Sequence, residues 1–167
     1  YYSERLILAP LNADVVSINE YCANMYPGEH YISKSVDEMG LDDLPHNSDQ
    51  AVPEEVLNSF SLPGFPDCEL KLKVGLPLIL LRNLNLNRRL SNGTRLLLKG
   101  VSNHVLRCKI MTGSCVGDEV LIPKIELFHQ GYQFPVARAF ALTINKAQGQ
   151  SLDHVSVYLP RPVFGHR

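Results

Sequence analysis

The chain has 167 residues, of which 45% are hydrophobic and 20% are charged, and these values are typical of a globular protein rather than a disordered tail. A chain of this length forms one medium domain or two small ones with a buried core. The formal net charge is −1, which excludes a globally basic protein, so any contact with nucleic acid requires a local patch.

The cysteines and the apolar runs exclude further classes of protein. Cys22, Cys68, Cys108 and Cys115 form no Cys-x-x-Cys pair and have no histidine at zinc spacing, so we expect free thiols in an intracellular, reducing compartment, with no metal site and no disulfide partner. No apolar run approaches the ~20 residues that span a bilayer. We find no secretory signal and expect no membrane partner.

The N-terminal residues predict a strand followed by a helix. Residues 5–9 are apolar enough for a buried strand, which Pro10 ends. Asn12 is a good helix N-cap, and the helix is predicted to run to about residue 26. Its apolar residues at helical spacing are Val15, Ile18, Cys22 and Met25.

A polar, acidic connector is predicted next, over residues 28–53, with a short strand at residues 31–35. Its carboxylates lack the spacing of a calcium loop, so a solvated loop is favoured over a metal site. Residues 54–60 predict one or two helical turns.

From residue 69 onward the pattern changes to short strands. Leu70, Leu72 and Val74 alternate with Lys71 and Lys73, which predicts a half-buried strand with a basic outer face. Several short strands with tight turns favour a small β-barrel. The further strands are predicted at residues 78–81, 94–99, 104–111 and 119–123, the last two paired across a turn at 112–118.

Three arginines mark the middle of the chain as a candidate basic rim. Arg88 and Arg89 lie in a loop, Asn92-Gly93 predicts a tight turn, and Arg95 follows on the next strand. The functional interpretation is a rim that faces DNA or a partner domain, and the alternative is an ordinary solvated surface.

The strongest local pattern lies near the C-terminus. The apolar run 134–142 predicts a buried strand, and Thr143 is a plausible N-cap of a short helix that continues through Lys146 to Gln148 before Gly149 ends it. Backbone N–H groups at such a corner point outward together and favour an anion. Residues 153–159 predict one more strand.

The side chains of this corner match the chemistry of a sugar-phosphate backbone. Lys146 adds a positive charge, and neutral hydrogen-bonding groups surround it. These groups belong to Thr143, Asn145, Gln148 and Gln150. The alternative is an ordinary strand-to-helix corner with a solvated polar face.

Residues 143–152, Thr-Ile-Asn-Lys-Ala-Gln-Gly-Gln-Ser-Leu, resemble motif V of superfamily-one helicases. They are most similar to the Pif-one (petite integration frequency) family of DNA helicases, including relatives carried by Helitron-type transposons. The likeness runs nearly end to end and in the family's order. Residues 5–19 resemble the motif IV region, residues 69–83 and 90–95 resemble the small accessory domain, and residues 133–136 and 158–166 resemble the segments that flank motif V.

This resemblance implies an α/β fold with three parts. Residues 1–55 are expected to begin a RecA-like second motor domain, a partial parallel sheet with helices. Residues 56–133 are expected to form an inserted small β-barrel of Src-homology-three type. Residues 134–167 are expected to return to the motor domain and to stop before motif VI. The chain also begins with Tyr-Tyr rather than Met, so we expect a piece of a longer protein.

The resemblance also implies a function and its residues. The parent protein is expected to be an ATP-dependent DNA helicase that translocates 5′-to-3′ on single-stranded DNA in repair, recombination, telomere maintenance or transposition, in the nucleus or mitochondria. The expected DNA-binding residues are Asn12, Thr143, Asn145, Lys146 and Gln148, and the expected nucleotide-cleft residues are Gly149 and Gln150. For Asn12, the alternative role is that of a helix cap.

The sequence lacks the Gly-x-x-x-x-Gly-Lys-Ser/Thr loop that cradles phosphates. No catalytic residue is therefore expected in this fragment, and ATP and Mg²⁺ are expected only in the complete protein, together with the missing first motor domain. Two alternatives stay open. One is a truncated transposon-derived relic that acts at most as a nucleic-acid or protein binding module, and the other is a protein-interaction β-barrel in which the motif V corner is only structural.

Overall fold

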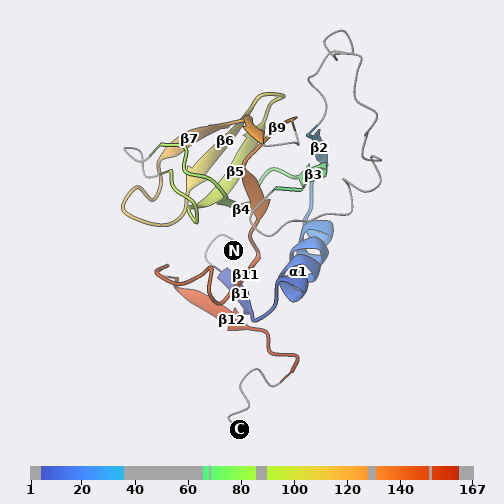
Figure 1. Cartoon of the computed structure of the whole chain (residues 1–167), viewed down its shortest axis with the longest axis vertical. Coiled ribbons are helices and arrows are strands. Elements are labelled where there is room, and N and C mark those ends of the chain that lie inside the picture. Colours follow the sequence, from blue (N-terminus) through green and yellow to red (C-terminus); the bar gives the residue numbers. More distant parts are fainter. Residues whose placement is uncertain are drawn as a thin grey trace, which may run out of the picture.

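The computed structural model describes residues 5–35, 66–67, 69–85, 90–127, 131–150 and 152–161. A parallel three-stranded sheet with one helix forms the lower part of the molecule in Figure 1, and an antiparallel five-stranded sheet forms the upper part. The predicted helical turns at 54–60, Arg88, Arg89, Cys68 and the acidic residues between 37 and 49 lie outside the described residues.

The parallel sheet is built around β1 (Arg5–Ala9). Strand β11 (Ala141–Thr143) pairs with one edge of β1, and β12 (His154–Val157) pairs with the other, both in parallel. This arrangement confirms the predicted strands at 5–9 and 153–159. Parallel pairing brings the carboxyl ends of all three strands to one edge of the sheet, where ligands bind in open α/β folds.

Helix α1 (Asn12–Met25) follows β1 and packs against the sheet (Figure 1). The N-cap residue is Leu11, with extended backbone angles and no side-chain cap hydrogen bond. The expected cap role of Asn12 is therefore wrong, because the chain turns into the helix one residue earlier. Met25 also departs from its predicted place on the buried face, with 71% of its surface exposed.

The five-stranded sheet confirms most of the predicted strands in the middle of the chain. The hairpin of β6 (Val105–Ile110) and β7 (Glu119–Pro123) forms as expected, and Gly93 adopts a φ of +94° in the predicted tight turn. In sheet order, its strands are β10 (Val136–Arg138), β4 (Pro77–Leu80), β5 (Arg95–Val101), β6 (Val105–Ile110) and β7 (Glu119–Pro123).

The apolar run 134–142 is two strands, not the single strand predicted. Strand β10 is antiparallel to β4 in the five-stranded sheet, whereas β11 is parallel to β1 in the other sheet. Apart from Arg138, the run is apolar, because it is largely buried in both sheets and at the crossing between them, where Ala139 is 0% exposed. Hydrophobicity alone does not reveal such a crossing, since apolar residues continue through it.

Two short hairpin sheets complete the described fold. Strand β2 (Tyr31–Lys34), which confirms the predicted short strand, pairs with β3 (Glu69–Leu72), and β8 (Ile125–Leu127) pairs with β9 (Gly131–Gln133). The side chain of Gln133 is fully buried and joins these parts. Its amide nitrogen donates to the carbonyls of Ser33 and Asp67 at 3.0 and 3.3 Å, and its amide oxygen accepts from the Ser33 hydroxyl at 2.8 Å.

Two apolar clusters hold the elements together. The larger one joins the five-stranded sheet to β3 and to Ala23 of α1. The smaller one lies where the two sheets meet, and consists of Leu6, Ile79, Leu81, Ala139 and Leu142. The second cluster is important for the site described below, because it fixes the position of β11 relative to the five-stranded sheet.

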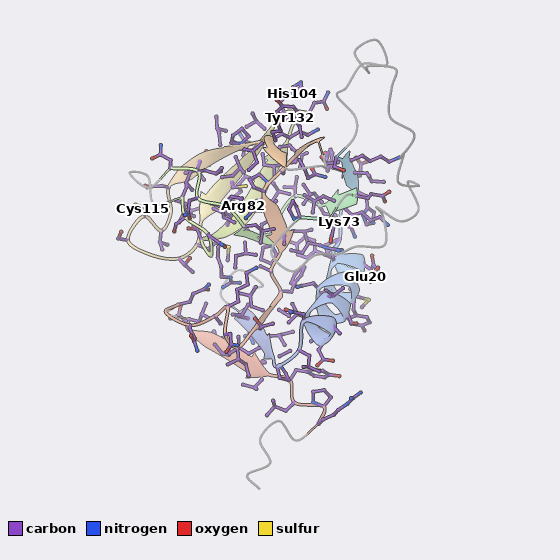
Figure 2. All side chains as sticks on the ribbon, in the orientation of Figure 1. Glu20, Lys73, Arg82, His104, Cys115 and Tyr132 are labelled. Atoms are coloured by element: carbon purple, nitrogen blue, oxygen red, sulfur yellow. The ribbon has the colours of Figure 1, made fainter. Side chains whose placement is uncertain are left out.

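The predicted basic outer face of the strand at 69–74 is wrong at Lys73, which is buried. Lys71 is exposed, but Lys73 is only 4% exposed, and its ammonium donates to the carbonyls of Tyr26 and Asn24 at 2.5 and 3.4 Å. Figure 2 shows Lys73 beside the upper end of α1. The strand ends at Leu72, so the alternation that the sequence suggests does not extend to Lys73.

Candidate nucleic-acid interface

Loop 144–150 connects β11 to β12 and carries the residues of the C-terminal motif. The Thr143 hydroxyl accepts from the Lys146 N–H at 3.3 Å, and the Thr143 carbonyl accepts from the Ala147 N–H at 3.1 Å. Thr143 therefore caps the segment as predicted, but the segment consists of successive turns and the predicted short helix is wrong. Gly149, with a φ of +77°, lies near its end.

The loop begins beside the start of α1. Ala9 and Thr143 are in register on neighbouring strands, and the Ile144 N–H donates to the Ala9 carbonyl at 3.2 Å. Asn12 follows three residues after Ala9, so Asn12, Thr143 and Asn145 come from the same carboxyl edge of the parallel sheet. Asn12 and Asn145 are exposed, and among the described residues neither side chain has a hydrogen-bond partner.

The second half of the loop faces the five-stranded sheet across a cleft of about 590 Å³. Lys146, Gln148, Gly149 and Gln150 line one wall of this cleft, whereas Thr143 and Asn145 do not line it. The structure thus brings the predicted nucleotide-cleft residues together with two of the predicted DNA-binding residues. The other wall consists of turn 91–94, loop 112–115 and Ile110.

Gln150 links the two walls. Its amide nitrogen donates to the Gly93 carbonyl at 3.2 Å, and its amide oxygen is buried without a hydrogen-bond partner among the described residues. A buried acceptor that makes no hydrogen bond costs about 1–3 kcal/mol, which is as much as the bond on the nitrogen contributes.

Lys146 is the only cation that lines the cleft within the described part of the chain. The side chain is half-buried, and desolvation lowers the pKa of its ammonium below the ordinary value of 10.5. No carboxylate of the described residues forms an ion pair with it. A partly desolvated ammonium without a counterion is a favourable place for an anionic ligand.

Arg95 does not form part of an exposed basic rim, so that prediction is wrong for this residue. It is 1% exposed, and its guanidinium donates to the carbonyls of Arg5 and Ala139 at 3.1 and 3.5 Å. Burial lowers the pKa of its guanidinium below the ordinary value for arginine. Arg95 therefore joins β5 to the start of β1 and to the crossing between the sheets. Arg88 and Arg89, the other two arginines of the predicted rim, stay untested.

Asn19 is a site-positioning residue that sequence reasoning missed. Its amide nitrogen donates to the Ala141 carbonyl at 3.0 Å, and its amide oxygen accepts from the Ala141 N–H at 2.8 Å. The side chain is 7% exposed, and it fixes the strand that feeds the loop. A polar residue between half-buried Ile18 and Cys22 was the available signal, because a buried amide requires a partner.

The described residues give no support to other kinds of site. They contain no group of three or more His, Cys, Asp or Glu side chains that would hold a metal ion. Cys22, Cys108 and Cys115 are free thiols, and burial raises the pKa of Cys108 to about 12, which makes it a poor nucleophile. Within the same residues, no helix is long and apolar enough to cross a membrane.

Fold and site together define a mixed α/β protein with a polar, lysine-bearing loop between a parallel and an antiparallel sheet. Residues 55–101 match the family model described as DNA helicase Pif1, 2B domain. No curated protein matches the chain. The remaining comparisons are with solved structures.

Three solved structures of Pif1 helicases have a similar fold. A structure of two coordinating Pif1 helicases that unwind forked double-stranded DNA matches 95% of this chain with a TM-score of 0.61 and 20% identity. Pif1 from Bacteroides in complex with ADP-AlF3 and single-stranded DNA matches 97% with a TM-score of 0.60 and 18% identity. Pif1 from Candida albicans matches 92% with a TM-score of 0.58 and 22% identity.

These comparisons confirm the resemblance to the Pif-one family and show that the chain has the fold of part of a Pif1 helicase. The chain spans 34%, 36% and 38% of the lengths of the three solved chains, respectively. Helicase activity of the complete protein is therefore a proposal. The relation to Helitron-type transposons stays a prediction.

Proposed function

We propose that this chain is the C-terminal part of an ATP-dependent DNA helicase. In this proposal, the parallel sheet with α1 belongs to a RecA-like second motor domain, and the five-stranded sheet is the core of an inserted barrel of Src-homology-three type. The observation that supports it most is the match of 95% of the chain to about a third of a Pif1 helicase chain. The complete protein would translocate 5′-to-3′ on single-stranded DNA and unwind duplex.

The residues at the carboxyl edge of the parallel sheet would hold the DNA strand. Lys146 is the strongest candidate for a phosphate contact, because its ammonium has no counterion among the described residues. Thr143, Asn145 and Asn12 offer hydroxyl and amide groups along the same edge, and such groups donate to phosphate oxygens without reading sequence. Gln148 would extend the contact into the cleft.

In this proposal, the chain does not by itself hold a nucleotide and its metal. Its described residues contain no group of three or more His, Cys, Asp or Glu side chains that would hold a metal ion, and the sequence lacks a phosphate-binding loop. ATP would therefore bind chiefly to the missing first motor domain, and its hydrolysis would supply the energy for translocation. Gly149 and Gln150 would face that domain, with Gly149 allowing close backbone approach. Closure of the two domains would shift the strand-binding edge along the DNA.

Single-stranded DNA binding by the 167-residue chain tests the strand contact. We expect Lys146→Ala to weaken binding of a fluorescent oligothymidine and to reduce the slope of log affinity against log salt by about one phosphate contact. Lys99→Ala is the matched control, since Lys99 is exposed on β5 and does not line the cleft. An unchanged slope for Lys146→Ala, or equal changes in the two variants, would argue against the contact.

A further inference from the structure

A second pocket, of about 320 Å³, lies at the other end of the five-stranded sheet from the cleft. The cleft is lined by turn 91–94, where β5 begins, whereas this pocket is lined by residues 101–103, where β5 ends and turns into β6. Its opposite wall is the hairpin of β2 and β3, which lies above α1 in Figure 1. Residues 143–150 do not line it. The pocket is therefore separate from the proposed DNA and nucleotide contacts.

The pocket has an apolar floor with an accessible aromatic ring beside it. Leu72 and Phe134 line it and are buried, and Val101 lines it from the end of β5. Tyr31 is in register with Leu72 on the neighbouring strand, so their side chains project from the same face of the hairpin. Tyr31 is nevertheless 42% exposed. Its ring is therefore available to an apolar group that enters the pocket.

A cation lies directly over this floor. Lys124 is half-buried, and its ammonium lies 5.5 Å from the centroid of the Phe134 ring. Among the described residues, no carboxylate lines the pocket or forms an ion pair with Lys124. A second lysine, Lys34, is in register with Glu69 on the face of the hairpin opposite to Tyr31, so we assign no ligand contact to it. The pocket thus combines one unneutralised cation with an apolar floor.

This combination favours a ligand that carries a carboxylate next to a large apolar group. The volume is at the small end of the ~300–1,000 Å³ that is usual for ligand pockets, which suits one anchoring side chain of a peptide. Ser102 and Asn103 add exposed hydrogen-bonding groups at the edge, which suit a peptide backbone. The phosphates of a nucleic acid would use the cation but leave the apolar floor without a partner.

We propose that this pocket docks an acidic peptide segment of a partner protein. One large apolar side chain of the segment packs against Tyr31 over Leu72 and Phe134, and a neighbouring carboxylate pairs with Lys124. The proposal goes beyond the proposed function, because it concerns a protein partner and uses none of the residues assigned to DNA or nucleotide. It makes the hairpin of β2 and β3, together with the β5–β6 turn, a protein-docking surface.

Binding of the fluorescein-labelled peptide Glu-Asp-Phe-Asp-Glu-Leu to the 167-residue chain tests the charge contact. We expect Lys124→Met to weaken binding about fivefold, because a unit charge near a carboxylate contributes this much even in water. Lys109→Met is the matched control, with the same change in net charge. Lys109 is exposed on β6 and lies four residues beyond Val105, which is roughly 13 Å from the end of β6 beside the pocket. This separation exceeds the Debye length of about 8 Å at physiological salt.

The apolar contact is tested by changing the peptide as well as the protein. We expect the peptide with Ala in place of Phe to bind about tenfold more weakly, because it loses the side chain that fills the pocket. Tyr31→Ala should weaken the Phe peptide about fivefold and leave the Ala peptide almost unchanged. Equal affinities of the two peptides for the unmodified chain would overturn the anchoring role. The midpoint of urea unfolding checks that each variant is folded.

Oligothymidine distinguishes a peptide site from a nucleic-acid site. If Lys124→Met weakens binding of oligothymidine as much as binding of the peptide, and excess oligothymidine displaces the peptide, the pocket binds phosphate and the proposal is wrong. No binding of the Phe peptide by the unmodified chain, or equal losses for Lys124→Met and Lys109→Met, would also refute it. Losses of peptide binding in Lys124→Met and Tyr31→Ala, with unchanged oligothymidine binding, support the docking site.

Discussion

At the scale of single residues, the fold changes what three polar side chains do. Lys146 is partly removed from water, so its charge is less stable than that of an exposed lysine. Asn19 is buried and fully bonded to the backbone of Ala141. Arg95 is buried with only carbonyl groups as observed acceptors. Each of these states follows from neighbours that are distant in the sequence.

The lowered pKa of Lys146 predicts a pH dependence for DNA binding. Desolvation lowers this pKa from 10.5, so the ammonium loses its proton, and its attraction for phosphate, at a lower pH than other lysines do. We expect the affinity of the chain for oligothymidine to fall as the pH rises, at a lower pH than the ordinary lysine pKa of 10.5 would give, and Lys146→Arg to keep its affinity there, because arginine stays charged. Binding isotherms at constant ionic strength check this. Parallel pH profiles for the two proteins would contradict it.

Asn19 predicts a large effect on stability. Replacing it with Ala leaves the buried N–H and C=O of Ala141 without partners, at about 1–3 kcal/mol each. We therefore expect Asn19→Ala to lower the free energy of unfolding by about 2–6 kcal/mol, measured by urea denaturation. Ser17→Ala on the exposed face of the same helix is the control and should stay within about 0.5 kcal/mol. Similar losses for the two variants would show that Asn19 does not act through Ala141.

At the scale of elements, α1 is held at its C-terminal end by Lys73, which directly follows strand β3. The last turn of α1 has no basic residue of its own, although a positive charge there favours the helix dipole. Lys73 supplies that charge after β3, and bonds the carbonyls of Tyr26 and Asn24. The helix thus ends beside β3, and the parallel sheet is connected to the remainder of the fold.

We expect Lys73→Met to destabilise the chain although methionine fills a similar volume. The substitution removes hydrogen bonds from a charged donor, which contribute about 1.5–3 kcal/mol each. Lys71→Met is the matched control, because Lys71 lies two residues earlier and makes only a half-exposed ion pair with Glu69 at 3.5 Å. Such pairs contribute about 0–1 kcal/mol. Urea unfolding of the two variants measures the difference, and equal losses would rule out a capping role for Lys73.

At the scale of the whole molecule, the two sheets act as one unit around the crossing at residues 138–141. Arg95, Asn19 and the apolar cluster of Leu6, Ile79 and Leu142 fix this crossing from different directions. The loop that follows is therefore well placed at its start, where β11 ends. Its far end is attached to the five-stranded sheet by the hydrogen bond that the Gln150 side chain donates to the Gly93 carbonyl.

The molecule as a whole is expected to lack ATPase activity on its own. The sequence has no phosphate-binding loop, and the described residues contain no group of three or more His, Cys, Asp or Glu side chains that would hold a metal ion. Phosphate release by the purified chain, with and without single-stranded DNA, should stay at the level of a protein-free sample. Turnover that persists after Lys146→Ala and increases with protein concentration would refute the proposed division of labour between two motor domains.

Much of the fold was predictable because local patterns report local structure. The strand at 5–9, the helix after Pro10 and the hairpin of β6 and β7 follow from periodicity and turn residues. The cap of Thr143 on its loop follows from side-chain chemistry. The family resemblance added the order of these elements, which the comparisons with Pif1 helicases confirm at the level of fold.

By itself, the sequence determined the strands at 5–9 and 31–34, the helix after Pro10 and the hairpin of β6 and β7, and which polar residues cluster after the apolar run at 134–142. Only the tertiary structure decided which of these residues meet. Arg95 contacts Ala139 across 44 residues of chain, Lys73 contacts Tyr26 across 47, and Asn19 contacts Ala141 across 122. The burial of Arg95 and Lys73 and the break between β10 and β11 depend on such contacts. Burial and hydrogen bonding at such separations leave no periodic trace in the sequence, because they are set by how the sheets pack against each other.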